Sequence, residues 1–151
     1  MSIKKILPAL VLSAAMIGFG ACSNDDDKSK DIEFNSLPQE ARNFVNTYYP
    51  GETIIRVEHN PSDHNDAYEV YFASGAKAEF DTSGLWTEVD GAPGKAIPAD
   101  ILPARTYDYV LTYYPTEYIT DASREVYGYE VGLNRSADLR FDRDGNYIDV
   151  D

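Results

Sequence analysis

The sequence is poor in the residues that most often carry chemistry. It contains a single cysteine, Cys22, and two histidines, His59 and His64. One cysteine excludes an intrachain disulfide. No Ser-His-Asp order, Cys-x-x-Cys motif or phosphate-binding glycine loop is present. No residue is therefore predicted to be catalytic, no cofactor is expected, and the chain is not expected to be an enzyme.

Basic residues are also scarce, because 13 Lys and Arg stand against 26 Asp and Glu, for a formal net charge of −13. A protein this acidic repels phosphate backbones and anionic lipid head groups. Nucleic acid is therefore not an expected partner. The hydrophobic fraction of 43% excludes general disorder, because such a chain can bury enough apolar surface to offset its conformational entropy.

The one long apolar run lies at the N-terminus. Residues 1–21 combine a short basic start with the apolar run 6–19 and small residues before Cys22, which is the layout of a secretory signal peptide. The run is too short to span a bilayer, which needs about 20 residues. Phe19-Gly20-Ala21-Cys22 resembles a bacterial lipobox, which implies cleavage before Cys22 and acylation of that residue. A free core cysteine is the alternative, and no foldable sequence surrounds it.

The lipobox resemblance predicts an exported outer-membrane lipoprotein that faces the periplasm or the cell surface. Acyl chains on Cys22 would hold it in the membrane, and stable anchoring requires more than one chain. Residues 22–34 are predicted to be the lipidated cysteine and a polar tether. A calcium site on Asp25–Asp27 is not expected, because consecutive carboxylates on a flexible chain are not held in a coordination shell.

The rest of the chain contains an internal duplication. The first copy of the downstream motifs comprises Tyr68-Glu69-Val70, Phe80-Asp81, Gly84 and Val89-Asp90. The second copy, 61 positions later, comprises Tyr129-Glu130-Val131, Phe141-Asp142, Gly145 and Val150-Asp151. Further upstream, Tyr48-Tyr49-Pro50 recurs as Tyr113-Tyr114-Pro115 at an offset of 65. The predicted domains are therefore repeat 1 at 35–90, a linker at 91–98 and repeat 2 at 99–151.

Each repeat begins with a predicted amphipathic helix and continues as strands. In repeat 1, Ser36 is the expected N-cap of that helix and Gln39 closes a capping box, and Pro50-Gly51 ends it. Period-two alternation then predicts four strands, the first at Thr53–Glu58. The predicted fold class is α+β, with two tandem α-β-β-β-β repeats, each a helix packed on one face of a four-stranded antiparallel sheet. The two repeats, which are small, are expected to pack on each other.

Strand alternation assigns side chains to the two sheet faces. The helix side is predicted to hold Val70, Phe72, Phe80, Val89, Val131, Leu133, Phe141 and Val150. The opposite side is predicted to hold Glu69, Tyr71, Lys77, Glu79, Asp81, Trp86, Glu88 and Asp90, and in repeat 2 Glu130, Arg140, Asp142, Tyr147, Asp149 and Asp151. That side is acidic, carries one large aromatic residue per repeat, and has no second helix to cover it.

The pattern Leu-Pro, Tyr-Tyr-Pro, Tyr-Glu-Val, Phe-Asp, Gly-x-Trp and Val-Asp resembles the PepSY-like family of secreted Bacteroidetes proteins, described as similar to the β-lactamase inhibitory protein. The resemblance covers Asp31–Asp151. It implies tandem helix-plus-sheet repeats and a periplasmic or surface location. Peptidase regulation and lactamase inhibition are not carried over, because a shared fold does not establish a shared function.

Two metal sites can be considered and neither is predicted. His59 and His64 lie beside Asp63 and Asp66, but in a loop that is longer than its counterpart in repeat 2 and is a poor frame for a rigid coordination shell. Asp142–Asn146 has some features of an EF-hand loop, yet that alignment puts Arg140 at the first position, where a carboxylate is required. A hairpin turn is the preferred interpretation of this segment.

The remaining candidate is a binding surface for a protein or peptide with a basic surface, possible roles being a hydrolase inhibitor or a folding aid. Aromatic rings supply rigid contact area and carboxylates favour a cationic partner. The candidate binding residues are Glu69, Tyr71, Glu79, Trp86, Glu88, Glu130, Arg140, Tyr147 and Asp149. One alternative is glycan capture with Trp86 and Tyr147 as stacking platforms. Another interpretation needs no ligand: the face serves solubility, and Trp86 is buried between the repeats.

Overall fold

The computed structural model describes residues 28–151. The predicted signal peptide at 1–21, the predicted acylation of Cys22 and residues 22–27 of the predicted tether lie outside the described residues, whereas Lys30–Asp31 of that tether form a β-strand. Among residues 28–151, no helix has the length and apolar character needed to cross a membrane.

The first half of the described chain contains one α-helix, one short 3-10 helix and five strands. They are β1 (Lys30–Asp31), the 3-10 helix (Phe34–Ser36), α1 (Gln39–Tyr48), β2 (Ile54–His59), β3 (Tyr68–Phe72), β4 (Lys77–Phe80) and β5 (Trp86–Asp90). The second half repeats the series without counterparts of β1 and the 3-10 helix: α2 (Ala104–Tyr113), β6 (Ile119–Arg124), β7 (Gly128–Leu133), β8 (Leu139–Asp142) and β9 (Tyr147–Val150). The predicted tandem α-β-β-β-β repeats are confirmed, and β1 is an addition that the strand pattern did not predict.

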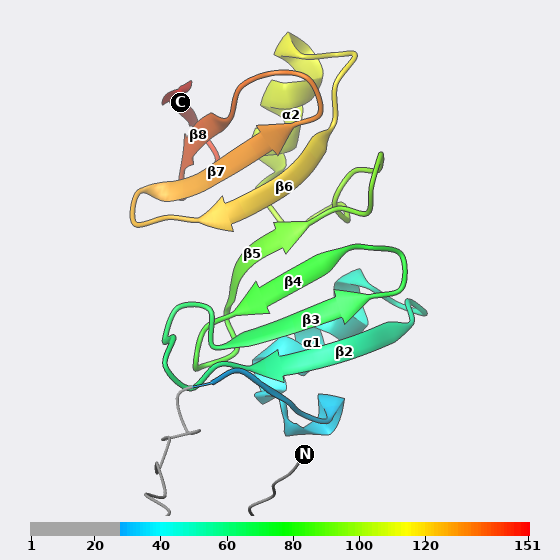
Figure 1. Cartoon of the computed structure of the whole chain (residues 1–151). Helices are drawn as coiled ribbons and strands as arrows, with labels where there is room; N and C mark the ends of the chain where they lie inside the picture. The colour runs from blue at the N-terminus through cyan, green and yellow to red at the C-terminus, as the bar shows by residue number, and fades with distance from the viewer. Residues whose placement is uncertain (1–27) are drawn as a thin grey trace, which may run out of the picture.

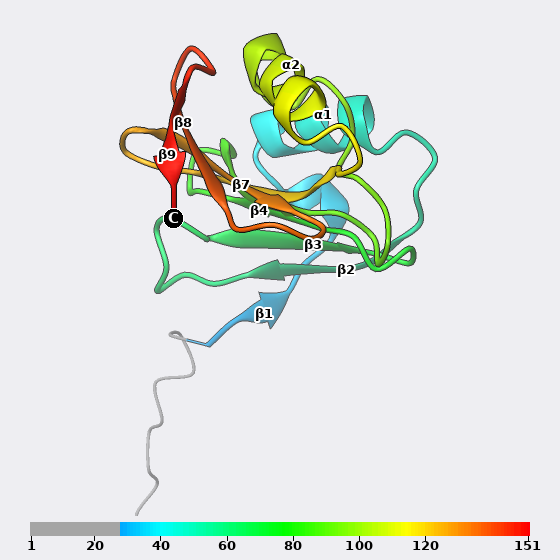
Figure 2. The same cartoon turned by 90° about the horizontal axis from the view of Figure 1, so that it is seen from above.

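All the strands form one antiparallel sheet of nine strands in chain order. Both helices lie on the same side of this sheet (Figure 2). We call the covered side the helix face and the other side the open face. The two repeats join edge to edge, because β5 pairs with β6 through Glu88–Ser123, Val89–Ala122 and Asp90–Asp121 (Figure 1). The repeats therefore contact each other by extending one sheet, an arrangement that the sequence pattern did not specify.

The core lies between the helices and the helix face. One row of opposed residues crosses the sheet from β2 to β9: Val57, Val70, Ala78, Val89, Ala122, Val131, Leu139 and Val150. Seven of these are buried, and each larger aliphatic side chain contributes about 1.5–3 kcal/mol when fully buried. Val150 is the exception at 47% exposure, because it lies on the last strand of the sheet, where no strand beyond it shields the side chain.

The predicted capping box is wrong. Ser36 ends the 3-10 helix, and the N-cap of α1 is Pro38, which offers no side-chain hydrogen bond. Pro103 is the equivalent N-cap of α2. A proline at this position is compatible with the extended backbone before each helix, which has φ near −51° and −55° in the two repeats.

The start of each helix rests on the tight turn between the last two strands of its repeat. In repeat 1 this turn contains Gly84, which has φ of +88°. A Cβ built at Gly84 would lie 2.7 Å from Pro38 Cβ and 2.9 Å from the Ala41 nitrogen. Gly145 meets Pro103 and Thr106 in the same way in repeat 2. Glycine is therefore required here both by the backbone conformation and by the close approach of the helix.

Replacing Gly84 by alanine is expected to lower the free energy of unfolding by about 2–4 kcal/mol, because positive-φ strain and steric overlap add. The matched control is Gly51→Ala. Gly51 also has positive φ, at +80°, but a Cβ at this position would meet no atom within 4 Å beyond its chain neighbours, so a loss of about 1–2 kcal/mol is expected. Chemical denaturation of both variants measures the difference, and equal losses would show that the helix contact at Gly84 is unimportant.

Candidate binding surface

One continuous row of mostly acidic residues crosses the open face. Strand register places the following residues opposite one another, from β1 to β9: Asp31, Glu58, Glu69, Glu79, Glu88, Ser123, Glu130, Arg140 and Asp149. We call its seven acidic members (all except Ser123 and Arg140) the carboxylate row. Neighbouring strands are about 4.8 Å apart, so carboxylates directly opposite each other repel. Such a row is unfavourable in isolation and attracts positive charge.

In repeat 1, two basic residues partly neutralise the row. The Lys77 ammonium contacts Glu79 Oε1 and lies 3.4 Å from Asp90 Oδ2. Arg56 Nη1 lies 3.1 Å from Glu58 Oε1, and its guanidinium carbon lies 4.2 Å from the centre of the Tyr71 ring. Both basic residues therefore form ion pairs with carboxylates of the open face.

Tyr71 lies in the neighbouring row of the same face and links two of the carboxylates. Its hydroxyl is within hydrogen-bond reach of Glu69 Oε2, and Glu58 Oε2 is 3.4 Å away. Burial and the nearby Glu69 carboxylate raise the pKa of Tyr71. The hydroxyl consequently stays protonated and acts as a donor between two negative groups.

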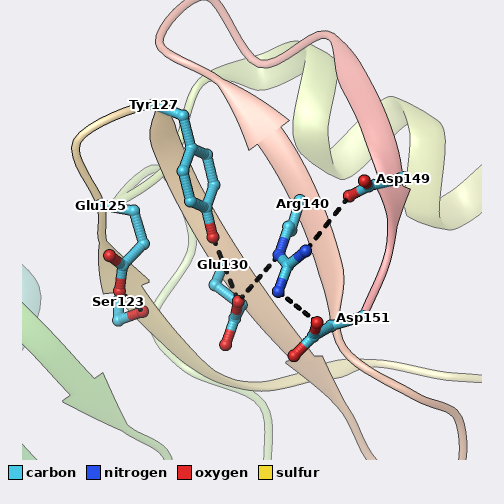
Figure 3. A network of polar contacts seen from close by, with 7 residues as sticks. All are labelled: Ser123, Glu125, Tyr127, Glu130, Arg140, Asp149 and Asp151. Atoms are coloured by element: carbon cyan, nitrogen blue, oxygen red, sulfur yellow. Dashed lines mark hydrogen bonds and ion pairs between the residues drawn. The ribbon is translucent and has the colours of Figure 1, made fainter.

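In repeat 2, one guanidinium forms ion pairs with three carboxylates (Figure 3). Arg140 Nε lies 3.3 Å from Glu130 Oε2, and Arg140 Nη1 lies 3.9 Å from Asp149 Oδ1. Arg140 Nη2 also contacts Asp151 Oδ1. The Tyr127 hydroxyl donates a second hydrogen bond to Glu130, with a length of 3.1 Å. The negative charge of this cluster exceeds its positive charge.

Two neighbouring carboxyl groups near the centre of the row, those of Glu79 and Glu88, have raised pKa values. Glu79 is only 8% exposed, and burial, with the nearby Glu69 and Asp66 carboxylates, raises its pKa despite the favourable contact with Lys77. Burial together with Glu79 and Asp90 raises the pKa of Glu88. Both shifts have the same cause: carboxylates held side by side on a partly dehydrated surface resist ionisation.

The placement of Trp86 and Tyr147 on the open face is wrong. A β-bulge follows each residue: Glu79 faces Glu88 while Phe80 faces Trp86, and Arg140 faces Asp149 while Phe141 faces Tyr147. One extra residue in each bulged strand reverses the side on which the preceding side chain lies. Strict alternation from Glu88 and Asp149 therefore assigned both rings to the wrong face, and their role in binding stays an untested prediction.

Both rings instead lie on the helix face. Trp86 is 7% exposed, its ring centre lies 6.2 Å from that of Phe44 on α1, and it stacks on Tyr129 of β7 at 6.0 Å. The Arg124 guanidinium lies over the Trp86 ring at 5.1 Å. Trp86 is thus buried between the repeats, as the sequence alternative stated. Tyr147 stacks on Tyr109 of α2 at 4.5 Å and remains 38% exposed.

The structure brings together most of the other candidate residues. Six of them occupy the row itself: Glu69, Glu79, Glu88, Glu130, Arg140 and Asp149. Sequence reasoning did not include Asp31 and Glu58 among the candidates. The alternation around Val57 could have placed Glu58 on this face, whereas nothing in the pattern around Asp31 indicates that it forms a strand.

The two loops considered for metal binding use their side chains for other contacts. The His59 ring stacks on Tyr68 at 4.7 Å, and Asp63 Oδ1 accepts hydrogen bonds from the backbone N–H groups of Asn65 and Asp66, each 3.0 Å long. Within residues 28–151, no three His, Cys, Asp or Glu side chains are placed to hold one metal ion.

The Asp142–Asn146 segment forms a hairpin turn. Asp142 Oδ1 accepts backbone hydrogen bonds from Asp144 (2.9 Å) and Asn146 (2.8 Å). Hydrogen bonds from the Asn146 side chain and these backbone groups lower the pKa of Asp142. Asp81 makes the equivalent contacts with Ser83 and Leu85 in repeat 1, so the acidic residue in each turn orders the turn itself.

Among the solved structures similar to this chain are three Bacteroides proteins. One, from Bacteroides thetaiotaomicron and described as a "putative calcium-regulated periplasmic protein", is 33% identical, with a TM-score of 0.76 over 83% of this chain and 98% of the other. A protein from Bacteroides vulgatus, described as a "putative periplasmic protein", is 34% identical, with a TM-score of 0.71 over 83% of this chain and 98% of the other. A second B. vulgatus protein, also described as a "putative periplasmic protein", shares the fold at 22% identity, with a TM-score of 0.72 over 82% and 99%.

No functionally curated protein is significantly similar to this chain. The family model described as "Putative beta-lactamase-inhibitor-like, PepSY-like" matches residues 23–65 and 66–149. The two matched segments together span most of the chain. The chain therefore belongs to this PepSY-like family.

Proposed function

We propose that the protein is a non-enzymatic, lipid-anchored module of the cell envelope that docks a protein or peptide with a basic surface on the open face of its sheet. The observation that carries the proposal is the carboxylate row, which has a member on seven of the nine described strands, all except β6 and β8. Inhibition of a hydrolase and assistance in its folding are both compatible with such docking. The family's inhibitor-like description supports a non-catalytic role.

The uneven distribution of charge supports this choice of partner. Arg56, Lys77 and Arg140 already contact acidic residues of the open face, yet the acidic side chains outnumber them. A partner that brings Lys or Arg side chains to this surface relieves the repulsion within the row and gains electrostatic complementarity. A glycan partner is less well supported, because the Trp86 ring that would serve as a platform is buried between the repeats.

The description of one relative as calcium-regulated raises the question of calcium at the same carboxylates. Ca²⁺ prefers six to eight oxygen ligands converging on one point. A row along a sheet instead spreads its carboxylates in a line, with about 4.8 Å between strands. This geometry suits several separate cationic side chains better than one dehydrated ion.

The proposed envelope location follows from the same comparison and from the N-terminal sequence. Three structural relatives are described as periplasmic, and the lipobox-like segment before Cys22 supports attachment to the outer membrane. Such an anchor would leave the open face free to meet partners in the envelope or at the cell surface.

The proposal predicts that decalysine binds the chain from residue 23 onward, and that binding weakens as salt rises. The test variant is Glu69→Gln/Glu88→Gln, which removes two charges from the row and is expected to weaken binding roughly tenfold. The control is Glu40→Gln/Asp108→Asn, which removes the same charge from exposed positions on α1 and α2. Isothermal titration calorimetry measures all three proteins.

Equal weakening by the two double variants would show that only net charge matters and would overturn docking at the row. The same three proteins then serve as baits for envelope extract. A biological partner should be captured by the wild type and by the helix control, and lost with the row variant.

A further inference from the structure

The outer edge of β9 forms a second surface, distinct from the open face. β9 (Tyr147–Val150) ends the sheet, and among residues 28–151 its pairing partner is β8 alone (Figure 2). All four of its residues are exposed, including Ile148 and Val150 at 47% each. The strand contains no proline, which is one of the residues that commonly protect such an edge from pairing.

The backbone of β9 offers hydrogen-bonding groups on its outer side. The Asp151 N–H donates to the Asp138 carbonyl at 2.9 Å, so the backbone at Asp151 is directed toward the β8 side. Alternate residues of an antiparallel strand direct their N–H groups to opposite sides. The Val150 N–H therefore faces away from β8, where a further strand could accept its hydrogen bond.

The pairing of β5 with β6 indicates how a strand could pair with β9, because β5 is the repeat 1 equivalent of β9. β6 pairs with the outer edge of β5, where Ala122 lies opposite Val89 and Ser123 lies opposite Glu88. Arg124 then lies over the Trp86 ring. At β9 the equivalent positions are Val150, Asp149 and Tyr147, with no strand beyond them in the described part of the chain.

Charge argues against a second copy as the occupant. Pairing β9 with β9 of another copy would bring the Asp149 and Asp151 carboxylates of two chains together, and each chain carries a formal charge of −13. Pairing β9 with β2 of another copy, which would repeat the β5–β6 arrangement, is blocked because β1 covers that edge through Lys30–His59 and Asp31–Glu58. Both observations favour a different protein as the occupant.

We propose that the outer edge of β9 is a strand-addition site for an extended segment of another protein. The segment runs antiparallel to β9 and is patterned like β6. It places a small apolar residue opposite Val150, a basic residue opposite Asp151 and an arginine over the Tyr147 ring. The basic residue is favoured because Glu130, Asp149 and Asp151 share only one guanidinium, that of Arg140.

The probe is a capped peptide with the sequence of residues 119–124 and the change Asp121→Lys, which gives Ile-Thr-Lys-Ala-Ser-Arg. NMR titration against the chain from residue 23 onward is expected to shift β9 amide signals. Val150→Pro removes the outward N–H and is expected to weaken peptide binding roughly tenfold. Val150→Ala keeps that N–H and serves as the matched control. Thermal unfolding confirms that both variants fold.

Backbone methylation of the peptide gives the second readout. N-methyl groups at every other residue block pairing when they fall on the side that meets β9, and leave it intact on the other side. One methylated series should therefore lose binding while the alternate series keeps it. Equal behaviour of the two series, or binding unaffected by Val150→Pro, would overturn strand addition. Concentration-dependent dimerisation through β9 without peptide binding would overturn it in favour of a second copy.

This inference does not depend on the proposed function, and the variants separate the two. Glu69→Gln/Glu88→Gln should leave peptide binding at β9 unchanged, whereas Val150→Pro should leave decalysine binding at the carboxylate row unchanged. If the unmodified protein binds the peptide but not decalysine, the proposed function alone fails, and if it binds decalysine but not the peptide, strand addition alone fails.

Discussion

Replacing Trp86 by alanine is expected to lower the free energy of unfolding by about 3–5 kcal/mol, the range for removing a large buried aromatic side chain. The loss should be large because Trp86 contacts both repeats: Phe44 of α1 on one side, and Tyr129 and Arg124 on the other. The variant should also unfold less cooperatively, with repeat 2 melting before repeat 1 or the reverse. Chemical denaturation followed separately by near-ultraviolet and far-ultraviolet circular dichroism measures both effects.

The chain provides its own control for this experiment. Tyr147 occupies the position equivalent to Trp86, stacks on Tyr109 and packs against Phe141, but it lies at the end of the sheet and is 38% exposed. Tyr147→Ala is expected to lower the free energy of unfolding by about 1–2 kcal/mol, which is less than the loss at Trp86, and to leave cooperativity intact. A loss at Tyr147 as large as that at Trp86 would show that contact between the repeats contributes little to stability.

Lys77→Met is expected to lower the free energy of unfolding at pH 7 by about 3 kcal/mol, because it leaves the buried Glu79 carboxylate without its counter-charge. Glu69 and Glu88 face Glu79 on the two neighbouring strands, so no other positive group replaces the ammonium. Restoring neutrality in Lys77→Met/Glu79→Gln should recover most of the loss. Lys95→Met, at an exposed site, should change stability by less than about 0.5 kcal/mol.

The deficit of Lys77→Met should shrink as the solution is acidified. Burial raises the pKa of Glu79 above its ordinary value of 4.5, so the folded state holds this proton more tightly than the unfolded state does. Stability from this group therefore falls as pH rises above that value and is recovered as pH falls. Removing Lys77 raises the pKa of Glu79 further, because the ammonium group lowers it in the wild type. The pH range over which stability changes with the protonation of Glu79 therefore becomes wider. Denaturation midpoints at pH 7 and pH 5 that show the same deficit would contradict this assignment.

The duplication made most of the fold predictable from the sequence. Motifs that recur at a constant offset of 61 require the same backbone twice, and the alternation of Val70, Phe72 and Phe80 with acidic residues fixes the side that the helix covers. The same alternation assigned six of the candidate residues to one face, on which the strand register aligns them in one row. These inferences depend on local periodicity, which strand geometry imposes directly.

Local periodicity could not predict the features that depend on pairing. The β-bulges that rotate Trp86 and Tyr147 onto the helix face exist because β4 and β8 each present one residue fewer than their partners there, and a single strand carries no sign of this. The joining of β5 to β6 likewise depends on which edges are left uncovered. The sequence of the joint itself, Val89 against Ala122, is compatible with many other neighbours.

The order of the strands has a consequence for how the protein folds. Every strand pairs with its neighbours along the chain. Six of the eight pairings join strands that are separated only by a turn or loop, whereas β1–β2 and β5–β6 each enclose a helix, so most of the strand pairing is local in sequence. Proteins of low contact order fold quickly, because little loop entropy is lost before contacts form. A polypeptide arriving N-terminus first could complete one hairpin after another, with the finished portion of the sheet acting as the nucleus for the strand that arrives next.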